Sequence, residues 1–209
     1  MSLTYVIKGG SWQSKSRNYA LRRIYSLVSQ LYSEDILIIG PCDEEIKIAK
    51  RKGLKFEITQ PDVKEAKRIE ETYRIKVLPY FLHEIPKEKK YKVIICLNVI
   101  DWEPIKLGEA LKRIYEILDD NGYLVISFYS RIFENAPDKD FIPQTTEKIL
   151  FKKKIEKYAP KRILILRNNK SHYYKLPIKY RDNNGILKTY LLTKRDLKLI
   201  IYERVLCNR

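Results

Sequence analysis

Apolar positions along the first part of the chain follow helical and strand periodicities in turn. In residues 16–32 they recur every three or four positions, with Arg22 and Arg23 on the opposite face, which predicts an amphipathic helix. Residues 36–39 and 93–97 are short, continuous apolar runs. Runs of this kind are typical of parallel strands that are buried on both faces.

The same pattern predicts strands at 35–40, 55–59, 75–78, 93–97 and 123–128, separated by helices at 43–53, 62–73 and 107–118. We expect Asp43 to cap the first of these helices and Gly53 to end it. Asp62 starts the second, with Val63, Ala66 and Ile69 facing inward, and Asn121-Gly122 is a turn signal. This alternation predicts an α/β fold with a doubly wound, mostly parallel, Rossmann-like sheet. Ligands bind such sheets at the carboxyl ends of the strands.

The pattern changes after Ser130. Residues 135–143 read as a loop, 145–158 as a lysine-rich helix and 162–166 as a strand. Segments 173–180 and 186–192 flank Asp182-Asn183-Asn184-Gly185, which predicts a hairpin. Thr193 and Asp196 resemble a capping box that starts a last helix through Leu206. We therefore predict a basic N-terminal helical segment (1–33), a core (34–130) and a basic C-terminal α+β extension packed on it (131–209).

The net charge of +16 lies at the two ends of the chain. Residues 1–33 contain five basic and no acidic residues, 34–130 contain 17 and 18, and 151–209 contain 17 and 4. Such asymmetry favours a polyanionic partner, RNA or DNA. The alternative is a composition typical of a hyperthermophile, rich in Lys, Glu, Ile and Tyr. That bias would raise the lysine content along the whole chain and would leave no segment neutral, whereas residues 34–130 are nearly neutral.

Other classes of protein are disfavoured by composition. No apolar run reaches the roughly 18 residues needed to span a bilayer, and the N-terminus lacks the apolar segment of a secretory signal. The three cysteines are far apart, so we expect no metal site and a reducing, cytoplasmic location.

Three segments resemble class I S-adenosylmethionine-dependent methyltransferases. Ile100-Asp101-Trp102, shortly after the fourth predicted strand, stands for the Leu-His-Trp triplet with which the family's fourth strand often ends. Residues 115–126, with Leu118-Asp119-Asp120-Asn121-Gly122 before an apolar strand, resemble the family's Leu-x-Pro-Gly-Gly pattern. Phe56-Glu57-Ile58-Thr59 is similar to its Val-Asp-Ile-Ser. The resemblance implies S-adenosylmethionine as cofactor, with Glu57 on the ribose.

The family's first loop, Asp-x-Gly-x-Gly-x-Gly, is represented here by Ile38-Ile39-Gly40-Pro41-Cys42-Asp43-Glu44, so that only Gly40 is kept. The resemblance assigns the cofactor site to a short set of residues, some of which have simpler roles in turns or packing. These are Gly40, Cys42, Glu57, Tyr80, Phe81 and Asn98.

Asn98 and Asp101 are the candidate catalytic residues, with Asp101 as a general base; both are equally candidates for loop capping. Trp102 is a candidate for stacking on the substrate, or else a core aromatic. Lys15 and Arg17, in a segment faintly similar to RNA ribose methyltransferases, are candidate substrate contacts.

Two functions remain open at this stage. One is a methyltransferase that acts on RNA or another polyanion. The other is a non-catalytic relative that binds nucleic acid or a protein partner, since a fold alone does not determine activity.

Overall fold

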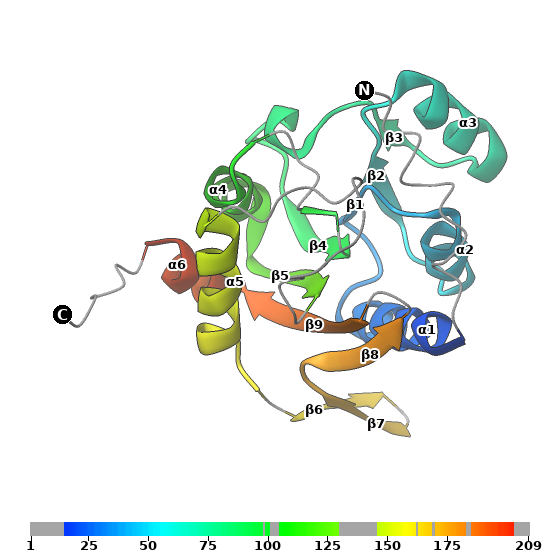
Figure 1. Cartoon of the computed structure of the whole chain (residues 1–209). Coiled ribbons are helices and arrows are strands. Elements are labelled where there is room, and N and C mark those ends of the chain that lie inside the picture. The colour runs from blue at the N-terminus through cyan, green and yellow to red at the C-terminus, as the bar shows by residue number, and fades with distance from the viewer. Residues whose placement is uncertain are drawn as a thin grey trace.

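The structure, a computed structural model of the 209-residue chain, describes residues 15–97, 99–100, 105–129, 146–161, 163–168, 170–182 and 185–202 (Figure 1). Within these ranges seven strands form one sheet in the order β3-β2-β1-β4-β5-β9-β8. The first five strands are parallel, β9 is antiparallel to β5, and β8 is antiparallel to β9. The strand bounds are β1 Ile36–Ile39, β2 Phe56–Thr59, β3 Val77–Leu78, β4 Tyr91–Leu97, β5 Leu118–Tyr129, β8 Ile178–Asp182 and β9 Gly185–Thr193.

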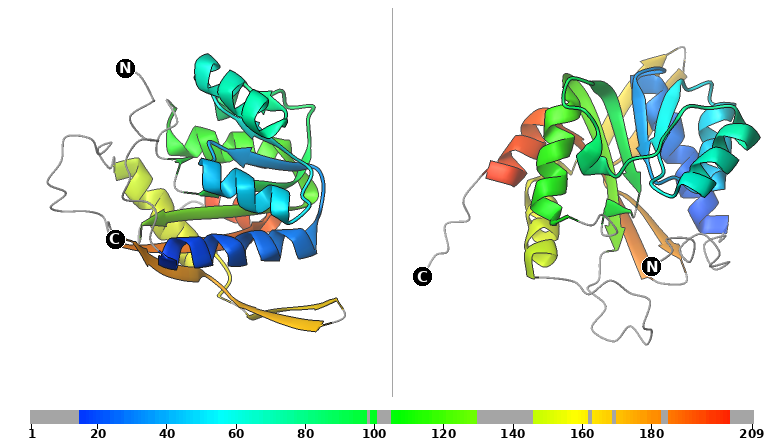
Figure 2. Two further views of the ribbon diagram at one scale, coloured as in Figure 1. Left: turned by 90° about the vertical axis from the view of Figure 1, so that its right-hand side faces the viewer. Right: turned by 90° about the horizontal axis from the view of Figure 1, so that it is seen from above.

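Helices cover both faces of this sheet (Figure 2). One face packs against α1 (Lys15–Leu31), α2 (Asp43–Arg51) and α3 (Val63–Tyr73). The other packs against α4 (Leu107–Ile117), α5 (Thr146–Tyr158), α6 (Lys194–Tyr202) and the short 3₁₀ helix η3 (Leu82–Glu84). The predicted doubly wound architecture is therefore confirmed.

Residues 93–97 of strand β4 are all apolar because both faces of the strand are buried. Val93, Ile95 and Leu97 lie in the core on the side of α1, while Ile94 and Cys96 lie in the core on the side of α4. All five side chains are buried, so neither face of the strand tolerates a polar residue.

The Asn121-Gly122 segment lies inside β5 rather than before it. Tyr91 pairs with Leu118 and Val93 with Tyr123, so residues 119–122 form an irregularity opposite Lys92. A Cβ on Gly122 would lie 2.9 Å from the Asp119 carbonyl oxygen and 3.0 Å from that of Lys92. Close approach of two backbone segments thus requires glycine here.

The basic C-terminal region completes the sheet. The predicted hairpin is confirmed, with Asp182 paired to Gly185 across the β8–β9 turn. The single strand expected at 173–180 is wrong, because it is divided between β7 (Lys170–Lys175) and β8. β7 instead pairs with β6 (Ile163–Asn168) in a separate antiparallel ladder. Pro177, which has no N–H to donate, lies at the division.

Three local predictions have definite outcomes. At the start of α6, Thr193 N donates to Asp196 Oδ2 (2.8 Å) and Asp196 N donates to Thr193 Oγ1 (3.2 Å), which confirms the capping box. Asp43 is the first residue of α2 and not its cap, which is Cys42. Val63 is 70% exposed and not inward, because at 100° per residue it lies about 120° from Ile69 around the helix.

Helix α1 joins the two basic regions of the chain. Gln30 Nε2 donates to the Tyr174 hydroxyl (3.1 Å), which lies 3.2 Å from Ser26 Oγ. The Arg23 guanidinium lies 6.0 Å from the centroid of the Tyr174 ring. Figure 2 shows α1 along the face of the sheet next to β8. Segments about 144 residues apart in sequence are therefore neighbours.

Candidate functional site

The carboxyl ends of β1, β2, β3 and β4 meet at one edge of the sheet, because these strands are parallel and adjacent. The residues that follow them are Gly40, Gln60, Pro79 and the segment after Leu97. In open α/β sheets the ligand crevice lies at this edge. We refer to it as the carboxyl edge.

Gly40 makes the turn out of β1. Its φ of +51° is a left-handed conformation that side chains with a Cβ rarely adopt. Its N–H lies 3.2 Å from both the carbonyl oxygen and the hydroxyl oxygen of Thr59, the last residue of β2. A Cβ on Gly40 would meet Val99 at 3.5 Å, an ordinary contact. Backbone conformation rather than space therefore selects glycine.

A buried polar cluster lies behind this turn, between α1 and α2. Cys42 N donates to Glu45 Oε2 (3.1 Å), and the Tyr25 hydroxyl donates to Glu45 Oε1 (3.3 Å). Arg17 Nη2 lies 3.6 Å from Cys42 Sγ and 3.9 Å from Glu45 Oε2. The side chains of Arg17 and Glu45 are only 11% and 4% exposed.

Burial controls ionisation in this cluster. Burial raises the pKa of Glu45 above its usual value, partly offset by the Arg17 charge and the hydrogen bond from Cys42 N. Burial and the neighbouring Glu45 charge raise the pKa of Cys42 to about 12, so its thiol stays neutral. Arg17, predicted to contact substrate, is placed by the structure against this loop. Lys15 begins α1, and its side chain lies outside the description.

Gln60, which the sequence analysis did not single out, lies where Glu57 was expected. It follows β2 directly and is 7% exposed. Its Oε1 accepts from Asp62 N (3.2 Å), and its Nε2 has no partner among the residues that the structure describes. Counting back from the helix start at Asp62 would have located this strand end.

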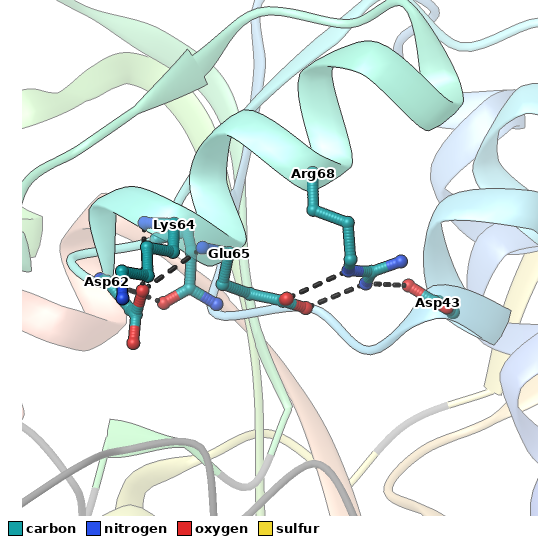
Figure 3. Close-up of polar contacts among 6 residues, drawn as sticks. Asp43, Asp62, Lys64, Glu65 and Arg68 are labelled. Atoms are coloured by element: carbon teal, nitrogen blue, oxygen red, sulfur yellow. Dashed lines mark hydrogen bonds and ion pairs between the residues drawn. The ribbon is translucent and has the colours of Figure 1, made fainter.

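An ion-pair network fixes the two helix starts beside the carboxyl edge (Figure 3). Asp62 Oδ1 accepts from Lys64 N (2.9 Å) and Glu65 N (3.0 Å), and so caps α3. Arg68 Nη2 bridges Glu65 Oε1 (2.7 Å) and Asp43 Oδ1 (2.9 Å). These two carboxylates raise the pKa of Arg68 above its ordinary value. The first turns of α2 and α3 are thereby linked.

Glu57 is directed toward the opposite, amino edge. Its carboxylate pairs with Lys76 (2.9 Å), with Lys89 and with the Tyr91 hydroxyl (2.9 Å), which all lie before or at the starts of β3 and β4. Burial alone would raise the pKa of Glu57, but these three hydrogen bonds outweigh it and hold the pKa below its usual 4.5. The structure does not bring Glu57 to the crevice, so the expected ribose contact does not fit its position.

Two aromatic residues follow β3 at the carboxyl edge. Tyr80 is 42% exposed, whereas Phe81 is half-buried and stacks on His83 at 5.8 Å between ring centroids. Tyr80 is therefore the more accessible ring for a planar ligand. Asn98, Asp101 and Trp102 lie outside the described residues, and their roles stay predictions.

Metal-binding clusters and membrane-spanning helices are both absent from the residues that the structure describes. In that part of the chain, no group of three or more His, Cys, Asp or Glu side chains could hold a metal ion. No helix there is long and apolar enough to cross a membrane.

No protein-family profile matches this sequence, and no curated protein matches it significantly. Solved structures do match. The chain is similar to the N-methyltransferase NodS from Bradyrhizobium japonicum in complex with S-adenosylhomocysteine (12% identity, 90% of each chain, TM-score 0.57). It is also similar to the 1,6-didemethyltoxoflavin N1-methyltransferase of Burkholderia thailandensis (13% identity, 91% of this chain and 84% of that one, TM-score 0.57). This chain has the methyltransferase fold.

A third structure with the methyltransferase fold is magnesium protoporphyrin IX methyltransferase from Synechocystis with bound S-adenosylmethionine. It shares 14% identity over 90% of this chain and 91% of its own, with a TM-score of 0.50. The likeness thus extends over nine-tenths of the chain.

Proposed function

We propose that the chain is an S-adenosylmethionine-dependent methyltransferase that acts on RNA or another polyanion. The observation that carries the proposal is the methyltransferase fold over nine-tenths of the chain, in neighbours that hold S-adenosylmethionine or S-adenosylhomocysteine. The basic ends of the chain, outside the neutral core, support a polyanionic substrate.

The residues at the carboxyl edge fit an adenosyl ligand. Gly40 turns the backbone with positive φ, as a loop that closely approaches a ligand requires. The Cys42 side chain, which replaces a family glycine, is directed into the buried cluster with Arg17 and Glu45. The amide nitrogen of Gln60, which has no partner in the described part of the chain, would donate to a ribose hydroxyl, and the exposed ring of Tyr80 would stack on adenine.

The cofactor would supply an electrophilic methyl group on a sulfonium that is already a good leaving group. The chain's own residues therefore need mainly to hold donor and acceptor in line. Asn98 and Asp101, which follow β4, would line the reaction site, with Asp101 accepting a proton from the acceptor if that group carries one. Trp102 would contact the substrate.

Calorimetric titration with S-adenosylhomocysteine tests the cofactor assignment. We expect binding by the wild-type chain and at least tenfold weaker binding by Gln60→Ala, because a buried donor to the ligand is lost. Glu57→Gln, at the amino edge, is the control and should bind as the wild type does. Absence of binding at millimolar ligand would refute the enzyme assignment.

One observation favours a second function, a non-catalytic protein that binds nucleic acid. Cys42 and Glu44 stand where the family's loop has its second and third glycines, and Glu44 adds a negative charge to the first turn of α2. Transfer of labelled methyl groups from S-adenosylmethionine to total RNA separates the two functions. Labelled RNA supports the enzyme, and RNA binding without cofactor binding supports the alternative.

A further inference from the structure

A row of lysines crosses the sheet near its carboxyl edge on the face covered by α5. Phe128 of β5 pairs with Lys188 of β9, and Lys188 pairs with Lys179 of β8. Residues directly opposite in antiparallel strands share a face. Lys152 of α5 adds a third lysine, with its Nζ 5.8 Å from the centre of the Phe128 ring. We call Lys152, Lys179 and Lys188 the lysine row.

Lys179 and Lys188, the paired lysines of the row, keep an excess of positive charge. Like charges directly opposite each other destabilise a sheet, yet Lys179 and Lys188 are such a pair. Glu156 offsets only one of them, with its Oε1 2.6 Å from Lys188 Nζ. Lys179 is exposed and has no partner among the described residues.

The surroundings of the row are basic as well. Between Glu156 and Asp182 the chain has eight basic residues and no acidic residue. On the other face of the sheet, α1 next to β8 has four basic residues and no acidic one. The two basic ends of the sequence therefore flank the edge strand β8 from both sides. The row lies at the end of this surface nearest to the carboxyl end of β5.

We propose that the lysine row binds the phosphate backbone of a single-stranded nucleic acid that passes across β8 toward the carboxyl edge. Tyr19 of α1, 64% exposed and 6.0 Å from the Arg23 guanidinium, offers a ring on which a base can stack. Delivery of the strand to a methyl-transfer site rests on the proposed function, whereas binding itself does not.

The observations favour nucleic acid over an acidic membrane. A helix that binds a bilayer needs an exposed apolar face. The apolar face of α1 is used inside the protein, since Leu21, Ile24 and Val28 are fully buried.

Binding of a labelled single-stranded 20-mer RNA is measured by fluorescence anisotropy in the absence of cofactor. Each phosphate contact to a single strand contributes about 0.7 to the slope of log K against log salt. Lys152→Ala/Lys179→Ala should therefore lower the slope by about 1.4 and weaken binding about 25-fold at 0.1 M salt. The matched control, Lys112→Ala/Lys198→Ala, removes two exposed lysines of α4 and α6 and should have little effect.

A second variant tests the row in the opposite direction. Glu156→Gln frees Lys188 from its carboxylate while keeping an oxygen acceptor, so RNA binding should become severalfold tighter. Glu109→Gln changes the net charge equally from an exposed position on α4 and should leave affinity nearly unchanged.

Four results would overturn the proposal. The first is no RNA binding at low salt, and the second is binding that both lysine doubles weaken equally. The third is RNA binding that both glutamine variants tighten equally, which would show that net charge alone determines the affinity. The fourth is binding to phosphatidylserine vesicles but not to RNA. Since no cofactor is present, failure here leaves the S-adenosylhomocysteine titration as an independent test of the enzyme.

Discussion

Replacing Glu57 distinguishes a structural carboxylate from a cofactor ligand. In Glu57→Ala the hydroxyl of Tyr91, a residue only 2% exposed, loses its acceptor, which costs about 1–3 kcal/mol. The ion pair with Lys89, whose side chain is 33% exposed, adds at most about 1 kcal/mol, and the pair with Lys76, which is 63% exposed, adds little because solvent screens it. We expect a loss of about 2–3 kcal/mol, or roughly 4–12 °C in Tm for a chain of this size. Glu57→Gln keeps an acceptor for Tyr91 and should lose about half as much.

Urea denaturation and thermal unfolding measure this loss, and the titration with S-adenosylhomocysteine accompanies them. Glu34→Ala is the matched control, because its ion pair with Lys55 joins side chains 54% and 81% exposed, and it should change stability by less than about 0.5 kcal/mol. A Glu57→Ala protein of unchanged stability with tenfold weaker ligand binding would refute the argument and restore the ribose contact.

The pH dependence gives an independent check. The pKa of Glu57 is lower in the folded chain than its usual 4.5, so its stabilisation is present above pH 4.5 and is lost as the pH falls through the folded value. The difference in stability between the wild type and Glu57→Gln should therefore shrink below pH 4.5.

Three other substitutions test separate features of the fold by denaturation. Asp62→Ala removes the acceptor for two N–H groups of α3 and should cost about 1 kcal/mol, whereas no loss would mean that the cap is dispensable. Thr189→Val removes a buried hydroxyl for which the described residues offer no partner, and it should be neutral or stabilise by up to about 1 kcal/mol; a clear loss of stability would show an unrecognised partner. Gly122→Ala would place a Cβ 2.9 Å from the Asp119 carbonyl oxygen and should destabilise by about 1–3 kcal/mol, and a neutral result would show that this segment relaxes freely.

The parallel part of the fold could be predicted because its strands are apolar throughout. β4 alternates between two cores, and no other element type suits a short run that is buried on both sides. The Asn121-Gly122 signal was less informative, because pairing of Leu118 with Tyr91 draws those residues into β5. At this position the pairing of β4 with β5 overrides the local preference for a turn.

The candidate site was harder to predict, because sequence similarity does not show toward which edge a side chain points. Glu57 matched a family pattern, yet Lys76, Lys89 and Tyr91 hold it at the amino edge. Gln60 was overlooked, although it directly follows β2 and precedes the helix cap at Asp62. The Arg17–Glu45 contact joins two helices, and no local pattern indicates such a pair.

The contact between α1 and Tyr174 also has a consequence for how the chain folds. About 144 residues separate Gln30 from Tyr174, so this side of α1 has no partner until most of the chain has been synthesised. Contacts of such long sequence separation slow folding, because the intervening chain must be ordered first. Docking of α1 on β7 and β8 is thus a late step in folding. Until that step, β8, the edge strand of the sheet, is not covered by α1.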